Sequence, residues 1–66
     1  MEIVVNGEKR QWDGPVAVGG LLEALGIPPG SVVVEKNLGI VPRERMAEEI
    51  LHDGDSVEII RLVGGG

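Results

Sequence analysis

The last three residues of the chain, Gly64, Gly65 and Gly66, have the composition most suited to covalent chemistry. Residues without a Cβ can pass through a channel too narrow for any other residue, and Val63–Gly66 can reach at most about 13 Å beyond a strand. The segment ends in a carboxylate. A carboxylate is a poor electrophile, but adenylation supplies a leaving group that a sulfur or nitrogen nucleophile can displace. We therefore expect covalent activation at Gly66 and threading of Gly64–Gly66 into the active site of a partner.

The alternative for this segment is a frayed terminus or a cloning remnant, since disordered termini are common. Against it, the glycines follow a strongly predicted strand without a linker, and nothing in "RLVGGG" resembles a tag. We expect a flexible glycine tail at 64–66 after a folded domain at 1–63.

The final predicted strand, "SVEIIRLV", carries more aliphatic residues than one buried face requires. Val57 and Ile59 are predicted to face a helix. The alternation of a strand then sends three residues to the opposite face: Glu58, Ile60 and Leu62. A single helix cannot cover both faces, so this face is a predicted partner interface, unless an edge loop covers Ile60.

Size and composition exclude several classes of function. Sixty-six residues form one small core with a stability of about 3–10 kcal/mol, too little to support a strained catalytic pocket, so we expect no catalytic residues and a carrier rather than an enzyme. The 11 acidic against 6 basic residues disfavour nucleic acid and anionic membranes and favour basic protein partners. No membrane span or signal peptide is apparent, which predicts a cytoplasmic protein.

The chain has no cysteine and a single histidine, His52. Disulfides, thiol nucleophiles and thiolate metal ligands are therefore absent, and the scattered carboxylates lack the spacing of a metal site. His52 beside a turn is expected to be solvated. Trp12 is expected to be core or half-buried, and Gly19-Gly20 to allow close packing or a loose first turn rather than phosphate binding.

The elements that must position the tail are marked by local signals. Asn6-Gly7 between two strand-like runs predicts a hairpin with a type I′ turn. Apolar spacing predicts a helix over 18–25, ended by Gly26. A buried strand is expected at 31–37, and a short helix at 42–50, of a turn or two, in which Met46 and Ile50 share a face.

The order of these elements predicts an α+β fold. One main helix over a mixed sheet of four to five strands is the simplest two-layer solution, with a short second helix or turn. The two terminal strands can lie side by side and parallel at the centre of the sheet. That arrangement is the ubiquitin-like β-grasp.

The residues also resemble the ThiS family, the ubiquitin-like sulfur carriers of thiamin thiazole biosynthesis. The resemblance runs along the whole chain, in "VNGE", "LLEALG", "VVVEKNLGIVPRERM" and "DGDSVEIIRLVGGG". The segment "IVPRE" together with the glycine end is fairly specific, whereas a terminal di-glycine is common to ubiquitin-like carriers.

The resemblance implies a pathway of partners around Gly66. A ThiF-type adenylating enzyme would use ATP and Mg²⁺, neither of them bound by this chain, to adenylate Gly66. A persulfide donor such as a cysteine desulfurase would convert the adenylate to a thiocarboxylate, and a ThiG-type thiazole synthase would take the sulfur. Two alternatives stay open: sulfur delivery to molybdopterin or another acceptor, and a β-grasp interaction module that is never activated.

Overall fold

The structure is a computed structural model and describes residues 1–63, so the predicted tail at Gly64, Gly65 and Gly66 lies outside the described residues. The described chain forms these strands and this helix: β1 (Glu2–Val5), β2 (Glu8–Gln11), β3 (Val16–Ala17), α1 (Val18–Ala24), β4 (Val32–Lys36), β5 (Gly39–Val41), β6 (Ile50–Leu51) and β7 (Ser56–Arg61). Short 3₁₀ turns occupy Pro29–Ser31 and Arg43–Arg45.

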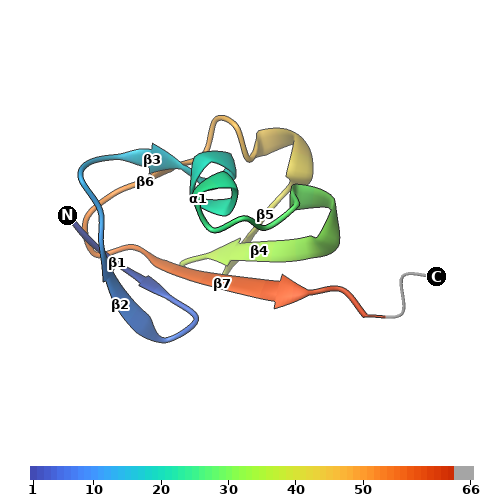
Figure 1. Cartoon of the computed structure of the whole chain (residues 1–66), viewed down its shortest axis with the longest axis horizontal. Helices are drawn as coiled ribbons and strands as arrows, with labels where there is room; N and C mark the ends of the chain where they lie inside the picture. The colour runs from blue at the N-terminus through green and yellow to red at the C-terminus, as the bar shows by residue number, and fades with distance from the viewer. Residues whose placement is uncertain (64–66) are drawn as a thin grey trace.

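The strands form a mixed five-stranded sheet in the order β2-β1-β7-β4-β5, and β3 pairs separately with β6. The terminal strands β1 and β7 are parallel neighbours, and every other pairing is antiparallel. Figure 1 shows α1 and the β3–β6 pair on one side of this sheet. The predicted β-grasp fold is confirmed.

The opening hairpin forms as its turn residues predict. Asn6 has φ 49° and Gly7 has φ 82°, the left-handed backbone that both central positions of a type I′ turn require.

The hydrophobic core lies between the sheet and the elements that cover it. It consists of buried aliphatic and methionine side chains: Ile3, Val5, Val18, Leu21, Leu22, Val32, Val34, Val41, Met46, Leu51 and Val57.

Helix α1 begins and ends for different reasons. Its end is local, because Gly26 takes φ 72° and the prolines that follow prevent continuation. Its start has no side-chain cap; instead the N–H of Val18 donates to the Glu49 carbonyl (2.8 Å) and that of Gly19 to the Met46 carbonyl (2.9 Å). A Cβ at Gly19 would lie 3.4 Å from the Met46 carbonyl oxygen and one at Gly20 would lie 3.1 Å from the Val16 side chain, so the paired glycines allow close packing at the start of α1.

The segment at 42–50 differs from the predicted short helix. It makes one 3₁₀ turn, Arg43–Arg45, followed by a second turn in which the N–H groups of Glu48 and Glu49 donate to the Arg45 carbonyl (both 2.9 Å), so the prediction of a turn or two is confirmed. The predicted shared face of Met46 and Ile50 is wrong: Met46 is buried, whereas Ile50 belongs to β6 and is 37% exposed. The cause is tertiary. The carbonyls of Met46 and Glu49 accept hydrogen bonds from the start of α1, and the next residues, Ile50 and Leu51, pair with β3 as strand β6.

Strand β7 lies at the centre of the sheet but is paired unequally on its two sides. Five residue pairs join it to β4, and only two, Val4↔Ser56 and Val5↔Val57, join it to β1. Where β1 ends, the Asn6 side chain takes over the ladder: its Oδ1 accepts from the Ile59 N–H (2.6 Å) and its Nδ2 donates to the Ile59 carbonyl (3.3 Å). Asn6 therefore both makes the turn and extends the pairing of β7.

Two substitutions at Asn6 separate these roles. Asn6→Gly keeps the positive φ and removes both hydrogen bonds, so we expect the free energy of unfolding to fall by about 1–2 kcal/mol. Asn6→Ala removes the same bonds and also places alanine, which tolerates left-handed backbone less well than asparagine or glycine, at φ 49°, so it should lose about 1 kcal/mol more. Urea denaturation measures both, with the exposed Lys9→Ala as the control that stays within about 0.5 kcal/mol of the unmodified chain. Equal stability of Asn6→Gly and the unmodified chain would show that this side chain does not hold β7.

Candidate functional site

The residues predicted to form a partner interface share one exposed face of β7. Val57 is buried and Ile59 packs against the core, so the alternation places Glu58, Ile60 and Leu62 on the uncovered side. Ile60 is 46% and Leu62 54% exposed. The predicted register is confirmed, and no loop among residues 1–63 covers Ile60.

The cross-strand register adds three residues to this face that the sequence had not indicated. Val33 lies opposite Ile60, Glu35 opposite Glu58, and Ile40 opposite Glu35. Directly opposed residues project to the same side of a sheet. We call the combined surface the outer face: Val33, Glu35, Ile40, Glu58, Ile60 and Leu62. The residues of β4 alternate between buried and partly exposed, but they can be assigned to this face only when the pairing of β4 with β7 is known.

The outer face has an acidic centre between aliphatic groups. Glu35 and Glu58 are directly opposed across β4 and β7, and neither forms an ion pair with another residue of 1–63. Like charges directly opposite one another destabilise a sheet. This arrangement suits a surface that receives a basic side chain from elsewhere.

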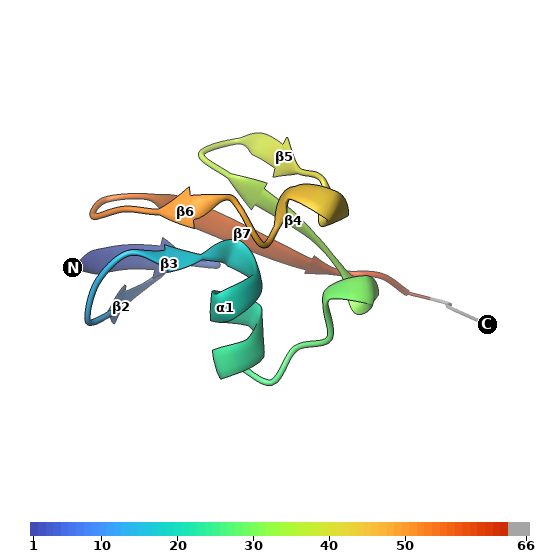
Figure 2. The ribbon, with the colours of Figure 1, turned by 90° about the horizontal axis from the view of Figure 1, so that it is seen from above.

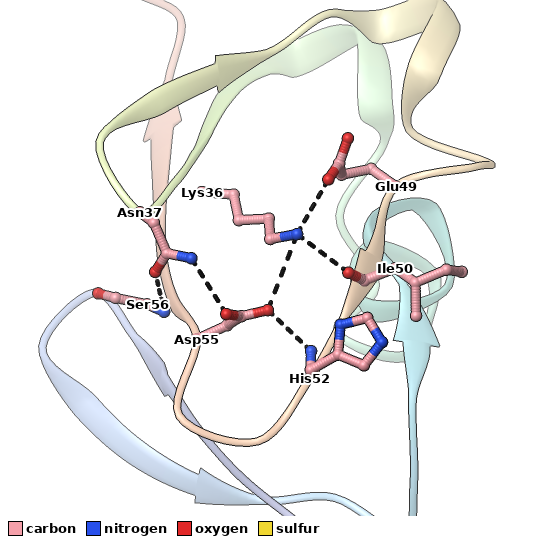
Figure 3. Close-up of polar contacts among 7 residues, drawn as sticks. All are labelled: Lys36, Asn37, Glu49, Ile50, His52, Asp55 and Ser56. Carbon is pink, nitrogen blue, oxygen red and sulfur yellow. Dashed lines mark hydrogen bonds and ion pairs between the residues drawn. The ribbon is translucent and has the colours of Figure 1, made fainter.

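The start of β7 is held by a polar network (Figure 3). Asp55 accepts hydrogen bonds from the His52 N–H (2.8 Å, to Oδ2) and from Asn37 Nδ2 (3.0 Å, to Oδ1). Asn37 Oδ1 in turn accepts from the Ser56 N–H (2.9 Å). Asn37, in the turn of the β4–β5 hairpin, thus holds Ser56 at the start of β7, just as Asn6 holds Ile59 further along the strand.

Lys36 closes the network from the end of β4. Its Nζ donates to Glu49 Oε2 (2.9 Å) and to the Ile50 carbonyl (3.1 Å), and lies 3.9 Å from Asp55 Oδ2. The hydrogen bond with Glu49 raises the pKa of Lys36 above its ordinary value, against the desolvation that lowers it. Figure 3 shows how one ammonium group joins β4, the loop before β6 and the turn before β7.

The carboxylate of Asp55 responds to opposing influences. Partial burial raises its pKa, but the hydrogen bonds from His52 and Asn37 and the charge of Lys36 outweigh burial, so the pKa of Asp55 lies below its ordinary value. Asp55 is therefore held ionised, and its charge stabilises the turn before β7.

Other residues considered from the sequence do not join the outer face. Trp12 is half-buried against the core, as predicted, and His52 is exposed and enters the network through its backbone N–H. Among residues 1–63, no three acidic or histidine side chains are placed to share a metal ion. None of the helices in that range has the length and apolar character that crossing a membrane requires.

The chain leaves β7 along a fixed line. The Leu62 N–H donates to the Ser31 carbonyl (2.9 Å), which extends the pairing beyond the last residue of β7. Figures 1 and 2 show the segment after β7 running away from α1 and from the rest of the sheet. Val63, the last described residue, is 95% exposed. The strand that carries the outer face thus continues into an exposed segment at Leu62 and Val63.

Comparison with known proteins agrees with this geometry. A family model described as the ThiS family matches residues 3–66. The Escherichia coli protein named sulfur carrier protein ThiS is 33% identical over 66 residues, 100% of each chain. A crystal structure of a thiamine biosynthesis protein (ThiS) from Geobacter metallireducens matches with a TM-score of 0.87 and 36% identity, covering 100% of both chains.

A longer relative carries a different name. A Paramagnetospirillum magneticum protein named thiazole synthase is 42% identical over 66 residues, which are 100% of this chain. The chain spans 20% of the length of the thiazole synthases that it matches.

The lowered pKa of Asp55 predicts how stability depends on pH. The unfolded chain binds a proton at Asp55 at a higher pH than the folded chain does, so the stabilisation is present above about pH 4 and is lost as the pH falls through the lower folded pKa. We expect the difference in unfolding free energy between the unmodified chain and Asp55→Asn to be constant from about pH 7 to 5 and to shrink below about pH 4. Urea denaturation at each pH measures it.

Asp13→Asn is the matched control, because Asp13 is exposed and makes no hydrogen bond through its side chain to another residue of 1–63. Its difference from the unmodified chain should stay near zero. A difference for Asp55→Asn that did not change between about pH 5 and 2 would contradict the assignment.

Proposed function

Because the chain belongs to the ThiS family, we propose that it is a sulfur carrier for thiamin thiazole biosynthesis and that Gly66 is the residue that carries the sulfur. The observation that supports this most is the geometry of β7. One strand, fixed on both sides, presents an uncovered face at Ile60 and Leu62 and leads into the exposed Val63.

The proposed chemistry takes place in the active sites of partners. A ThiF-type enzyme with ATP and Mg²⁺ forms the acyl adenylate of Gly66 and releases pyrophosphate. The outer sulfur of a persulfide donor such as a cysteine desulfurase then displaces AMP to form an acyl disulfide, and a thiol reductant cleaves the S–S bond and leaves the thiocarboxylate. The chain contributes the carboxylate and the docking surface, and acts as a protein co-substrate. The sequence contains no cysteine, so a thiocarboxylate is the form in which this chain would hold the sulfur.

The proposed acceptor is a ThiG-type thiazole synthase. Relatives with that name contain a segment that matches the whole of this chain, which supports thiazole synthase over molybdopterin as the destination. In those relatives, the carrier segment and the thiazole synthase that accepts the sulfur would be parts of one polypeptide.

We propose the outer face as the surface that docks on the ThiF-type enzyme. Its aliphatic residues bury apolar area, and the opposed Glu35 and Glu58 favour a partner with an arginine or lysine at the matching position. The net charge of −5 favours the encounter with a basic surface.

A second candidate is an interaction module that uses the outer face and is never activated. The outer face favours it equally, since an exposed aliphatic surface does not require a reactive terminus. The two functions differ in their dependence on Gly66.

The test of sulfur carriage is modification of Gly66 in vitro. With a ThiF-type enzyme, ATP, Mg²⁺ and a sulfide source, intact-mass spectrometry should show one oxygen replaced by sulfur. Deletion of Gly66, or one residue appended after it, should abolish the modified species while leaving the unfolding transition unchanged. A native chain that stays unmodified beside an active enzyme would refute carriage, and a module would bind its partner equally well with the appended residue.

The docking proposal predicts the effect of a charge on the outer face. Ile60→Asp should weaken binding to the ThiF-type enzyme by about tenfold or more, because it places a third carboxylate beside Glu35 and Glu58 and removes apolar contact. Calorimetric titration measures binding, and the melting temperature should fall little because Ile60 is half exposed. Ile50→Asp, a similarly exposed isoleucine on β6, is the matched control. Equal losses from both variants would place the docking surface elsewhere.

A further inference from the structure

A pocket of about 310 Å³ opens at the end of the core, on the side of the sheet that α1 covers. Its lining combines the aliphatic residues Val5, Leu25, Ile27, Val32 and Ile59 with the polar residues Asn6, Glu8, Arg10 and Arg61. We call it the β2–α1 pocket. The volume is at the small end of the range for ligand sites, which suits one aliphatic side chain better than a large cofactor.

Two arginines give this pocket a charge opposite to that of the chain. Arg10 lies across from Ile3 and Arg61 across from Val32, so both project to the core side of the sheet. Neither guanidinium forms an ion pair with a residue of 1–63. With Glu8 included, the rim carries +1 on a chain whose net charge is −5. A carboxylate is therefore attracted here and repelled by most of the remaining surface.

The free edge of β2 runs beside the same pocket. Strand β2 pairs only with β1, and its four residues are exposed. The Trp12 N–H donates to the Met1 carbonyl (2.8 Å), which fixes the alternation of the ladder. The backbone groups of Lys9 and Gln11 consequently point to the open side. An added strand would find its hydrogen-bond partners there and place alternate side chains on the pocket side.

From this combination we propose that the β2–α1 pocket binds an extended peptide segment of a partner protein, in which an aliphatic residue is followed two positions later by Asp or Glu. The aliphatic side chain enters the pocket, the carboxylate lies next to Arg10 and is attracted by Arg61 from a greater distance, and the peptide backbone pairs with β2. Residues two apart in a strand face the same way, which gives the spacing. The site is on the opposite side of the sheet from the outer face and does not depend on activation of Gly66.

The test is an NMR titration of the full-length ¹⁵N-labelled chain with the blocked peptide STITETS, compared with STITKTS. We expect saturable shifts of the Lys9, Gln11, Ile59 and Arg61 amides with STITETS and binding at least about threefold weaker with STITKTS. Equal binding of the two peptides, shifts confined to the outer face, or no saturation at millimolar STITETS would each overturn the proposal.

Charge variants make the test specific. Arg10→Gln should weaken STITETS binding by about threefold, Arg61→Gln should weaken it by a smaller factor because Arg61 acts from a greater distance, and Glu8→Gln should strengthen it. Lys9→Gln is the matched control, because Lys9 lies opposite Val4 and projects to the other side of the sheet. All four positions are exposed, so the variants are expected to fold. If Lys9→Gln weakened binding as much as Arg10→Gln, the peptide would be bound by general charge attraction and not at this pocket, which would overturn the proposal.

Discussion

The pairing of β7 on both of its sides is the constraint on which this structure depends. Strand β1 is too short to cover it, so backbone pairing ends at Val57 and the side chain of Asn6 continues it at Ile59. At the other end, Asn37 holds Ser56 in the same manner. Each asparagine is also a turn residue with φ 49°, so one residue type supplies both the left-handed backbone and the missing ladder partner. The direction in which the chain leaves the sheet follows from these bonds.

Local signals were sufficient to predict most of the fold. The Asn6-Gly7 turn, the apolar spacing of α1 and the alternation of β7 each involve neighbours in sequence, and each was found as predicted. The β3–β6 pair and the end of the turns before Ile50 were not predictable in this way. Both follow from the need of α1 for carbonyl partners at Met46 and Glu49, and a tertiary requirement of that kind leaves no periodic pattern.

The outer face was predicted in part for the same reason. Period two along one strand assigns Glu58, Ile60 and Leu62 to a side, but it cannot say which residues of β4 and β5 join them. Val33, Glu35 and Ile40 required the register between strands. Asn37 and Asp55 show the limit most clearly, because the hydrogen bond between their side chains joins residues 18 positions apart.

The two uncovered surfaces arise because the described chain has a single α-helix, which lies on one side of the sheet and is short. Helix α1 has 7 residues and spans about 10 Å, whereas the 6 residues of β7 span about 20 Å. A helix of that length cannot cover one face of the sheet completely, and it leaves the opposite face bare. The incomplete cover exposes Ile59 and Arg61 at the mouth of the β2–α1 pocket, and the bare side is the outer face. Because alternate residues of β7 line both surfaces, a partner seated on the outer face and a peptide in the pocket would contact the same strand from opposite sides. A longer helix would close the pocket without altering the outer face. The two surfaces can therefore be changed independently, although β7 contributes residues to both.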